Sequence, residues 1–211
     1  MKAKPTVPTG TLSTPLSTRD QILQAAMGLF VERGFAATTT LEIATRARVS
    51  KRELYKLVGN KDEMLALCIT RRGNRMRLPE GFPEPTDRAR LEAALRKYGA
   101  TLLCEITEPA VLETFRLGIA EAKRSPAIAR TLSERGREPA RSALEAMLTS
   151  ARAAKLLADG NMDEMLHDFG ALLWGNTMVW ILLGLEKAPG PKEIERRAER
   201  AAHRFLELYG R

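Results

Sequence analysis

The sequence has little of the chemistry on which enzymes and metal sites depend. Its 211 residues include only two cysteines and two histidines. Cys68 and Cys104 have no second cysteine or histidine at metal-ligand spacing, and the chain contains no glycine-rich phosphate loop or nucleophile elbow. We therefore expect no enzyme, no metal site and no other cofactor. The two cysteines are expected to be reduced residues of the core or of a pocket in a cytoplasmic protein.

No apolar run is long enough to cross a membrane. The longest stretch without a charged residue covers the 17 residues 169–185 and contains Asn176 and Thr177. A membrane-spanning helix needs about 20 residues. The N-terminal residues also lack the apolar run of a signal peptide. The sequence thus predicts a buried helix at 169–185 and no membrane partner.

Basic residues outnumber acidic ones by 34 to 26, which gives a net charge of +8. This balance suits a polyanionic partner but does not prove one. Hydrophobic residues make up 44% of the chain, which is too many for a disordered protein. The length fits one ordinary domain or two small ones.

Residues 39–61 carry the pattern of a helix-turn-helix. The pattern predicts two short helices joined by a tight corner at Arg48 and Val49, and the second helix of such a pair can lie in a DNA major groove. Ser50 is placed to cap this second helix, and Glu53 would complete a capping box. Between residues 44 and 56 a single acid, Glu53, accompanies five basic residues: Arg46, Arg48, Lys51, Arg52 and Lys56.

Turn signals divide the chain into a tail and two helical parts. Residues 1–16 are rich in Thr, Pro and Ser and predict a flexible tail, whose Lys2 and Lys4 leave open a role as a basic arm on DNA. The proline-rich stretch 78–86 predicts a hinge loop. We expect an all-α protein of about nine helices, with three helices at 17–60 and a larger helical part at 61–211. The expected helices are 18–33, 40–47, 50–58, 61–77, 87–107, 109–124, 126–157, 162–185 and 192–209, and a kink near Gly136 and Pro139 is expected in 126–157.

Six short groups of residues between positions 17 and 64 form one pattern: Gly34-Phe35, Thr38-Thr39-Thr40, Ile43-Ala44, Val49-Ser50-Lys51, Leu54-Tyr55 and Gly59-Asn60-Lys61-Asp62-Glu63. This pattern resembles the N-terminal signature of the tetracycline-repressor (TetR) family. Two differences from the family pattern stand in the second helix, where Leu57-Val58 replaces an aromatic residue or His followed by Phe, and Arg52 replaces a small residue. The operator sequence therefore does not carry over. The resemblance implies that residues 17–60 are a three-helix DNA-binding domain and that residues 61–211 are a ligand-binding and dimerisation domain.

The resemblance implies a ligand-responsive, sequence-specific DNA-binding regulator, expected to be a repressor that a small molecule releases from a palindromic operator. It implies base contacts by Lys51 and Arg52, and a phosphate or base contact by Arg48. The alternative is a helical small-molecule-binding protein whose helix-turn-helix serves packing or protein contact. The residues implied to contact phosphates are Thr39, Thr40, Ser50, Tyr55, Lys56 and Lys61.

The last two predicted helices are expected to form a homodimer interface. The stretch 169–185 is apolar nearly all round, so it must be buried on more than one side. The helix 192–209 carries small alanines on one face, which would let another helix approach closely. We expect dimerisation through 162–185 and 192–209, as the resemblance also implies. The alternative is that 192–209 packs only within its own subunit.

The predicted helices from 61–77 through 162–185 are expected, as the resemblance implies, to enclose a small-molecule pocket. The few polar residues among its candidate lining suggest a mostly hydrophobic effector. Each candidate lining residue is also compatible with an ordinary core position. Four arginines stand near the end of the predicted helix 61–77, and we favour the interpretation that this end is exposed to solvent. They are Arg71, Arg72, Arg75 and Arg77. The alternative is that one or two of them bind an acidic head group of the ligand. The candidate pocket residues are Leu67, Cys68, Tyr98, Leu102, Phe115, Ile119, Met147, Trp174 and Met178.

Overall fold

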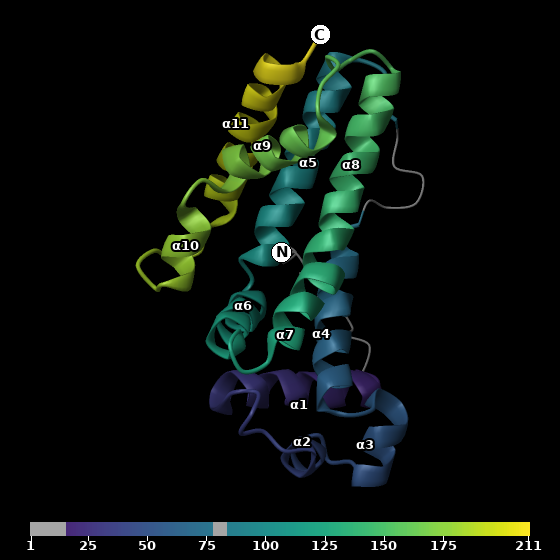
Figure 1. Ribbon diagram of the computed structural model, residues 1–211, viewed down its shortest axis with the longest axis vertical. Helices are drawn as coiled ribbons and strands as arrows, with labels where there is room; N and C mark the ends of the chain where they lie inside the picture. The colour runs from purple at the N-terminus through teal and green to yellow at the C-terminus, as the bar shows by residue number, and fades with distance from the viewer. Residues whose placement is uncertain (1–15, 78–83) are drawn as a thin grey trace, which may run out of the picture.

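The computed structural model describes residues 16–77 and 84–211 and confirms an all-α protein. Across these ranges the only β-type pairing is an isolated bridge between Leu157 and Gly210. The first three helices form a layer at one end of an elongated molecule, and the later helices rise from it (Figure 1). The predicted tail, apart from Leu16, and most of the predicted hinge loop at 78–86 lie outside the described residues.

The N-terminal layer consists of α1 (Thr18–Arg33), α2 (Thr40–Arg46) and α3 (Lys51–Val58), and α4 (Lys61–Arg75) follows. The Ser17 hydroxyl caps α1, and Gly34 ends this helix with φ +84°. A side chain would be strained in that backbone conformation, which explains the glycine. One apolar cluster joins the four helices; its fully buried members include Ile22, Phe30, Ile43, Leu54 and Met64.

The remaining helices are α5 (Arg88–Ile106), α6 (Pro109–Glu121), α7 (Pro126–Thr131), the π-helical η1 (Leu132–Arg137), α8 (Glu138–Ala153), α9 (Met162–Trp174), α10 (Thr177–Leu182) and α11 (Pro191–Tyr209). The predicted helix 126–157 is therefore three consecutive helical segments. Pro139 has no N–H to donate to the carbonyl four residues earlier, so the α-helical ladder is interrupted where η1 meets α8.

The prediction of one unbroken helix over 162–185 is wrong. Gly175 adopts φ +49° and ends α9, its N–H donating to the Ala171 carbonyl, and the chain starts again as the short α10. The uncharged composition of this stretch did not reveal the break because a glycine is compatible with either path. No helix in the described part of the chain is long and apolar enough to cross a membrane.

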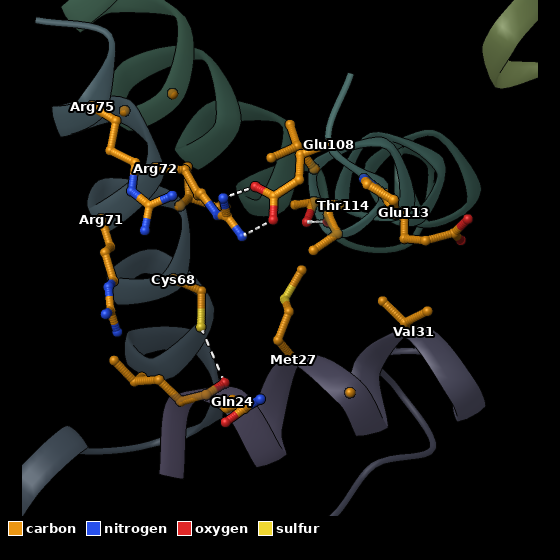
Figure 2. Close-up of a pocket in the computed structure, with 18 of the residues that line it drawn as sticks. Gln24, Met27, Val31, Cys68, Arg71, Arg72, Arg75, Glu108, Glu113 and Thr114 are labelled. Atoms are coloured by element: carbon orange, nitrogen blue, oxygen red, sulfur yellow. Dashed lines mark hydrogen bonds and ion pairs between the residues drawn. The ribbon is translucent and has the colours of Figure 1, made fainter. Parts of the chain in front are cut away.

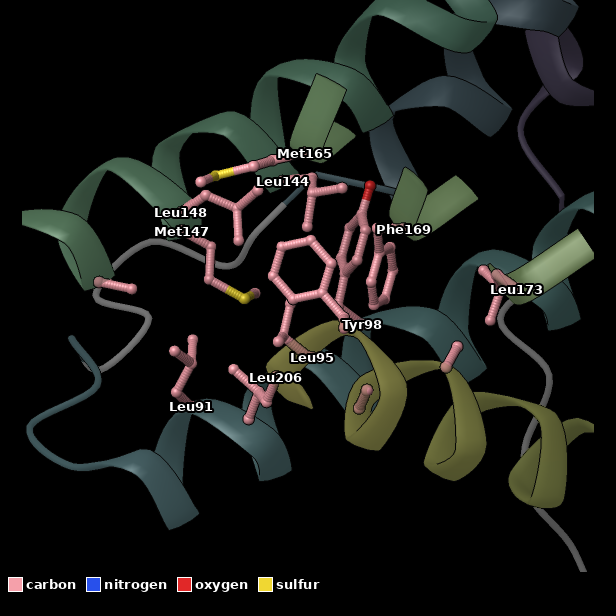
Figure 3. Packing of buried hydrophobic residues seen from close by; sticks show 14 of the residues in the cluster. Leu91, Leu95, Tyr98, Leu144, Met147, Leu148, Met165, Phe169, Leu173 and Leu206 are labelled. Carbon is pink, nitrogen blue, oxygen red and sulfur yellow. The ribbon is translucent and has the colours of Figure 1, made fainter. Parts of the chain in front are cut away.

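A second apolar cluster fills the C-terminal part, where α11 lies along α5 and α9. Phe169 and Phe205 meet edge to face, with ring centroids 5.6 Å apart. Figure 3 shows Tyr98 and Phe169 among the leucines and methionines of this cluster. The face of α11 with Ala198, Ala201 and Ala202 is buried here, so the helix that approaches these alanines is α5 of the same chain. The small residue opposite is Gly99, whose Cβ position would lie 3.5 Å from the Ala198 Cβ.

Candidate nucleic-acid interface and effector cavity

The corner between α2 and α3 depends on Arg48, which has φ +56°. Its N–H donates to the Thr45 carbonyl at 3.1 Å, and the Val49 N–H donates to the Ala44 carbonyl at 3.0 Å. Leu54 and Val58 on α3 are buried against the other N-terminal helices. The opposite face of α3 is thereby turned to the solvent.

This solvent face of α3 is cationic. Lys51, Arg52 and Lys56 are exposed, as is Arg48 in the corner. None of the four forms a salt bridge within residues 16–77 and 84–211. The Tyr55 ring is 45% exposed and lies 5.9 Å from the Lys51 Nζ. The surface thus offers free cations and a phenol at one end of the molecule, which is the chemistry that contacts a nucleic-acid backbone and base edges.

Two of the predicted phosphate-contact residues, Thr39 and Ser50, also cap helices of the fold. The Thr39 hydroxyl accepts from the Glu42 N–H at 3.2 Å, and the Glu42 carboxylate accepts from the Thr39 N–H at 2.8 Å, which completes a capping box at α2. These bonds hold the pKa of Glu42 below its usual value. The Ser50 hydroxyl caps α3 by accepting from the Glu53 N–H at 3.1 Å. The predicted return bond from the Glu53 carboxylate is not among the contacts of the described residues.

Two cations near the corner are used to hold the N-terminal layer together. The Arg46 guanidinium donates to both carboxylate oxygens of Glu32 on α1, at 2.9 and 2.7 Å. The Lys61 Nζ donates to the carbonyls of Phe35 at 2.7 Å and Thr38 at 3.0 Å. Lys61 was predicted to contact a phosphate, but its ammonium group lies against the loop before α2. The sequence shows the positive charges of Arg46 and Lys61, but it does not show which carboxylate and carbonyl groups accept their hydrogen bonds.

Thr40 connects the two short helices. Its hydroxyl lies 3.3 Å from the Tyr55 hydroxyl, so one of the two donates to the other. Either hydroxyl still has a lone pair or proton free for a further bond. The structure therefore brings Thr40 and Tyr55 together beside the exposed cations of α3.

A cavity of about 690 Å³ lies next to this layer, between α1, α4 and α6. Figure 2 shows Gln24, Met27 and Val31 on α1 facing Cys68 and Arg72 on α4 and Thr114 on α6. The Cys68 thiol donates to the Leu23 carbonyl at 3.5 Å, and burial raises the pKa of this thiol to about 11. Cys68 is therefore a neutral wall residue.

The predicted pocket residues do not share one cavity within the described residues. Cys68 lines the cavity between α1, α4 and α6, whereas Tyr98 and Met147 are buried in the C-terminal core. Leu102 and Trp174 pack at the edge of that core, and Leu67 packs on the N-terminal cluster. Ile119 is exposed, and Phe115 and Met178 are half-buried. Sequence reasoning missed the contribution of α1 to the cavity because α1 belongs to the DNA-binding part.

Two family models match the chain. The model described as "Bacterial regulatory proteins, tetR family" matches residues 22–68. The model described as "AefR-like transcriptional repressor, C-terminal domain" matches residues 93–211, which is more than half of the chain.

Curated relatives match only in part. The HTH-type transcriptional regulator HbdR of Aromatoleum sp. (strain CIB) is 45% identical over 51 residues, which are 24% of this chain and 22% of that protein. The HTH-type transcriptional repressor Rv3405c of Mycobacterium tuberculosis (strain ATCC 25618 / H37Rv) is 35% identical over 81 residues, which are 38% of this chain and 42% of that protein. The chain thus matches less than half the length of either relative.

Solved structures are similar over nearly the whole chain. A TetR transcriptional regulator from Agrobacterium tumefaciens superposes with a TM-score of 0.76 at 29% identity, covering 92% of this chain and 96% of that one. The Flavonoid-responsive Regulator FrrA superposes with a TM-score of 0.73 at 30% identity, covering 92% and 97%. With its helix-turn-helix, its cationic α3 and both family matches, this chain belongs to the TetR family of transcriptional regulators.

Proposed function

We propose that this regulator is a repressor that binds a palindromic operator as a homodimer and leaves it when a small molecule binds. The observation that carries the proposal is the exposed cationic face of α3, whose Lys51, Arg52 and Lys56 form no salt bridge within the described residues. The alternative of a helix-turn-helix used for packing or protein contact is disfavoured, since it leaves these cations without a use. A chromosomal DNA target puts the site of action in the cytoplasm.

At the DNA, Lys51 and Arg52 are proposed to read base edges, because they stand at the N-terminal end of the recognition helix. Arg pairs well with guanine O6 and N7. Thr40, Tyr55 and Lys56 are proposed to contact phosphates. Arg48, in the corner, is proposed to reach a phosphate or a base edge. Thr39 and Ser50 are proposed to add phosphate contacts through hydroxyls that also cap their helices.

Dimerisation is proposed through the α9–α11 region, but not through the alanine face of α11, which α5 already covers. The support comes from large apolar side chains on and just after α10. Val179, Trp180, Leu183 and Leu185 are between 41% and 68% exposed, which is an unusual concentration for a free surface. A two-fold pair would then present two α3 helices to half-sites about 34–36 Å apart.

The effector is proposed to be a small, mostly apolar molecule. The name of the similar FrrA describes a flavonoid-responsive regulator, so a flavonoid is a reasonable first compound to test. The ligand would act by favouring a different pivot of α4 and hence a different separation of the two α3 helices. It can shift this balance only by its difference in affinity for the two arrangements.

Two substitutions on α3 separate base reading from phosphate contact. Arg52→Ala should cost about 1–3 kcal/mol of operator binding and relax the preference at one operator position. Lys56→Ala should weaken binding equally on all sequences. It should also reduce the slope of log affinity against log salt concentration by about one. Both are measured by binding to a library of single-position operator variants over a salt series. If Arg52→Ala leaves the base preference unchanged at every operator position, Arg52 does not read a base.

A further inference from the structure

The cavity between α1, α4 and α6 has the size of a small-molecule site. Its volume of about 690 Å³ lies within the range of about 300–1,000 Å³ that such sites occupy. One wall is α1, which packs directly on the DNA-contacting helices α2 and α3. A ligand in this cavity would therefore touch the DNA-binding part of the molecule itself.

One part of the cavity is apolar. Met27 and Val31 extend from α1 toward α6 (Figure 2), and Val111 at the start of α6 also lines the cavity. Leu23 and Ile69 close the floor between α1 and α4. This part would hold the hydrocarbon or ring portion of a ligand, because filling it removes apolar surface from water.

The other part of the cavity holds the guanidinium groups of Arg71, Arg72 and Arg75, all from α4. Arg71 is bound to Asp20 at 2.5 Å, and Arg72 donates to Glu108 at 2.8 Å. Among the described residues, the acidic partner of Arg75 is a carboxylate oxygen of Glu105, 3.7 Å from the Arg75 Nη1, which is beyond hydrogen-bond distance.

The remaining acids of the lining are already satisfied by arginines outside it. Glu32 is held by Arg46, and Glu113 is held by Arg116. At the start of α6, no side chain caps the first N–H groups, and this positive helix end also faces the cavity. Arg75 therefore keeps hydrogen-bond donors that could bind an added anion, beside the buried Glu105 Oε2, which is itself without a hydrogen-bond partner among the described residues.

The electrostatics of Arg72 support the same conclusion. Its pKa is lowered, first by burial and then by the neighbouring charge of Arg75. Two guanidinium groups that repel each other at the edge of an apolar space are stabilised by an added anion. An uncharged or cationic head group would bring no such gain.

We propose that this cavity binds an amphipathic acid, with its acidic head group at Arg75 and Arg72 and its apolar body against Met27 and Val31. Binding changes operator affinity because the same groups fasten the helices. Arg71–Asp20 ties α4 to α1, and Arg72–Glu108 ties α4 to α6. A head group that competes for these guanidiniums loosens α4 from its neighbours. This consequence rests on the proposed DNA-binding function, whereas the site itself does not.

The site is tested with two fluorescent probes of nearly the same ring system. 1-Anilinonaphthalene-8-sulfonate carries an anionic group, and N-phenyl-1-naphthylamine has none. Arg75→Gln should weaken binding of the sulfonate about tenfold, which is the loss of one charge-assisted contact. It should leave the uncharged probe unchanged. Arg77→Gln is the matched control, because Arg77 lies on the same helix end and is bound to Asn74, outside the cavity lining.

Filling the cavity should block both probes. Met27→Trp places a larger side chain in the space, and Val31→Trp does so from a position that is 39% exposed and therefore tolerant of change. If Met27→Trp and Val31→Trp both fold and still bind the probes, the probes lie elsewhere and the proposed site is wrong. If Arg75→Gln weakens the binding of both probes equally, the proposal of an acidic ligand is wrong. It is also wrong if Arg77→Gln weakens binding of the sulfonate as much as Arg75→Gln does.

The coupling is tested by adding the sulfonate probe to the operator complex. We expect about a tenfold or greater loss of operator affinity at saturating probe in the wild-type protein, and no loss in Met27→Trp. Probe binding without any change in operator affinity would overturn the coupling. Failure of the protein to bind DNA under any condition would contradict the proposed function, while the two probe experiments would still decide the site.

Discussion

At the scale of the residue, charged side chains near the recognition helix serve two different purposes. Arg46 and Lys61 donate to Glu32 and to the carbonyls of Phe35 and Thr38, so their charges hold the N-terminal layer together. Arg52 and Lys56 have no such partner in the described chain and remain exposed. We therefore propose that Arg52 and Lys56 contact DNA, whereas Arg46 and Lys61 hold α3 in position.

Gly59 is a single residue on which the position of α3 relative to α4 depends. Its φ of +77° and ψ of −148° lie in a region that is essentially restricted to glycine, and a Cβ would lie 2.0 Å from a Glu63 carboxylate oxygen of the α4 capping box. Gly59→Ala should lower the free energy of unfolding by about 1–3 kcal/mol. The measurement is urea unfolding followed by circular dichroism.

Gly170→Ala serves as the control for this change. Gly170 lies inside α9, and no atom lies within 4 Å of its Cβ position. Alanine there should stabilise the protein by about 0.5–1 kcal/mol, since glycine is the poorer helix former. If Gly59→Ala and Gly170→Ala change the free energy of unfolding equally, a side chain at position 59 does not strain the backbone.

The sequence could predict local residue roles but not distant partners. The caps at Thr39 and Ser50 and the exposed cations of α3 follow from spacing over a few residues. The Lys61 ammonium, by contrast, binds carbonyls more than twenty positions earlier in the chain. Its role depends on how the loop before α2 folds back on α4, and no local pattern records that path.

At the scale of the element, α4 is the helix that connects DNA-binding layer and cavity. It begins at the Asn60 cap beside α3, and its far half crosses η1 (Figure 1). At this crossing Gly73 approaches so closely that a Cβ would lie 2.1 Å from the Arg135 carbonyl oxygen. The backbone contact fixes the direction of α4 and hence the position of the layer below it.

Gly73→Ala should therefore force α4 away from η1. We expect a loss of about 1–3 kcal/mol in the free energy of unfolding, as for other overpacked sites, together with weaker operator binding. Gly136→Ala is the matched control on η1, because its nearest neighbour is a methyl group of Ile69 at an ordinary 3.4 Å. Unaltered stability and DNA binding in Gly73→Ala would show that α4 is not held by this crossing.

Helix existence was predictable from the sequence, but continuity and contacts of the helices were not. The break at Gly175 depends on a positive φ that nothing in the apolar pattern demands. The alanines of α11 correctly indicated a close helix approach, yet the approaching helix is α5 of the same chain. A periodic pattern predicts which face of a helix is buried, whereas the helix that packs on this face is determined by the whole fold.

At the scale of the whole molecule, α6 connects the cavity with the surface proposed for dimerisation. It carries Glu108 at the cavity and Arg116 at its other side. The Arg116 guanidinium donates to the carbonyls of Leu182 at 3.1 Å and Ile181 at 2.8 Å, which are the last groups of α10. We therefore expect a shift of α6 to affect α10 as well as α4.

A charge on the α10 surface should separate the two subunits. Leu183 is 64% exposed in the single chain, so Leu183→Arg should leave the fold intact while placing a charge in an apolar interface. Sedimentation velocity should then report a monomer. Leu41→Arg, on α2 and 63% exposed, is the control and should remain a dimer. A wild-type protein that is itself monomeric at micromolar concentration would contradict this interface.

The most direct test of the account is binding of the purified protein to duplexes selected from random sequence, followed by footprinting over a salt series. The account predicts an inverted repeat with half-site centres about 10–10.5 base pairs apart, or a multiple of that spacing, and one dimer on each site. The affinity should fall steeply as salt rises. Binding without sequence preference, or no binding at low salt with or without the candidate effectors, would contradict it.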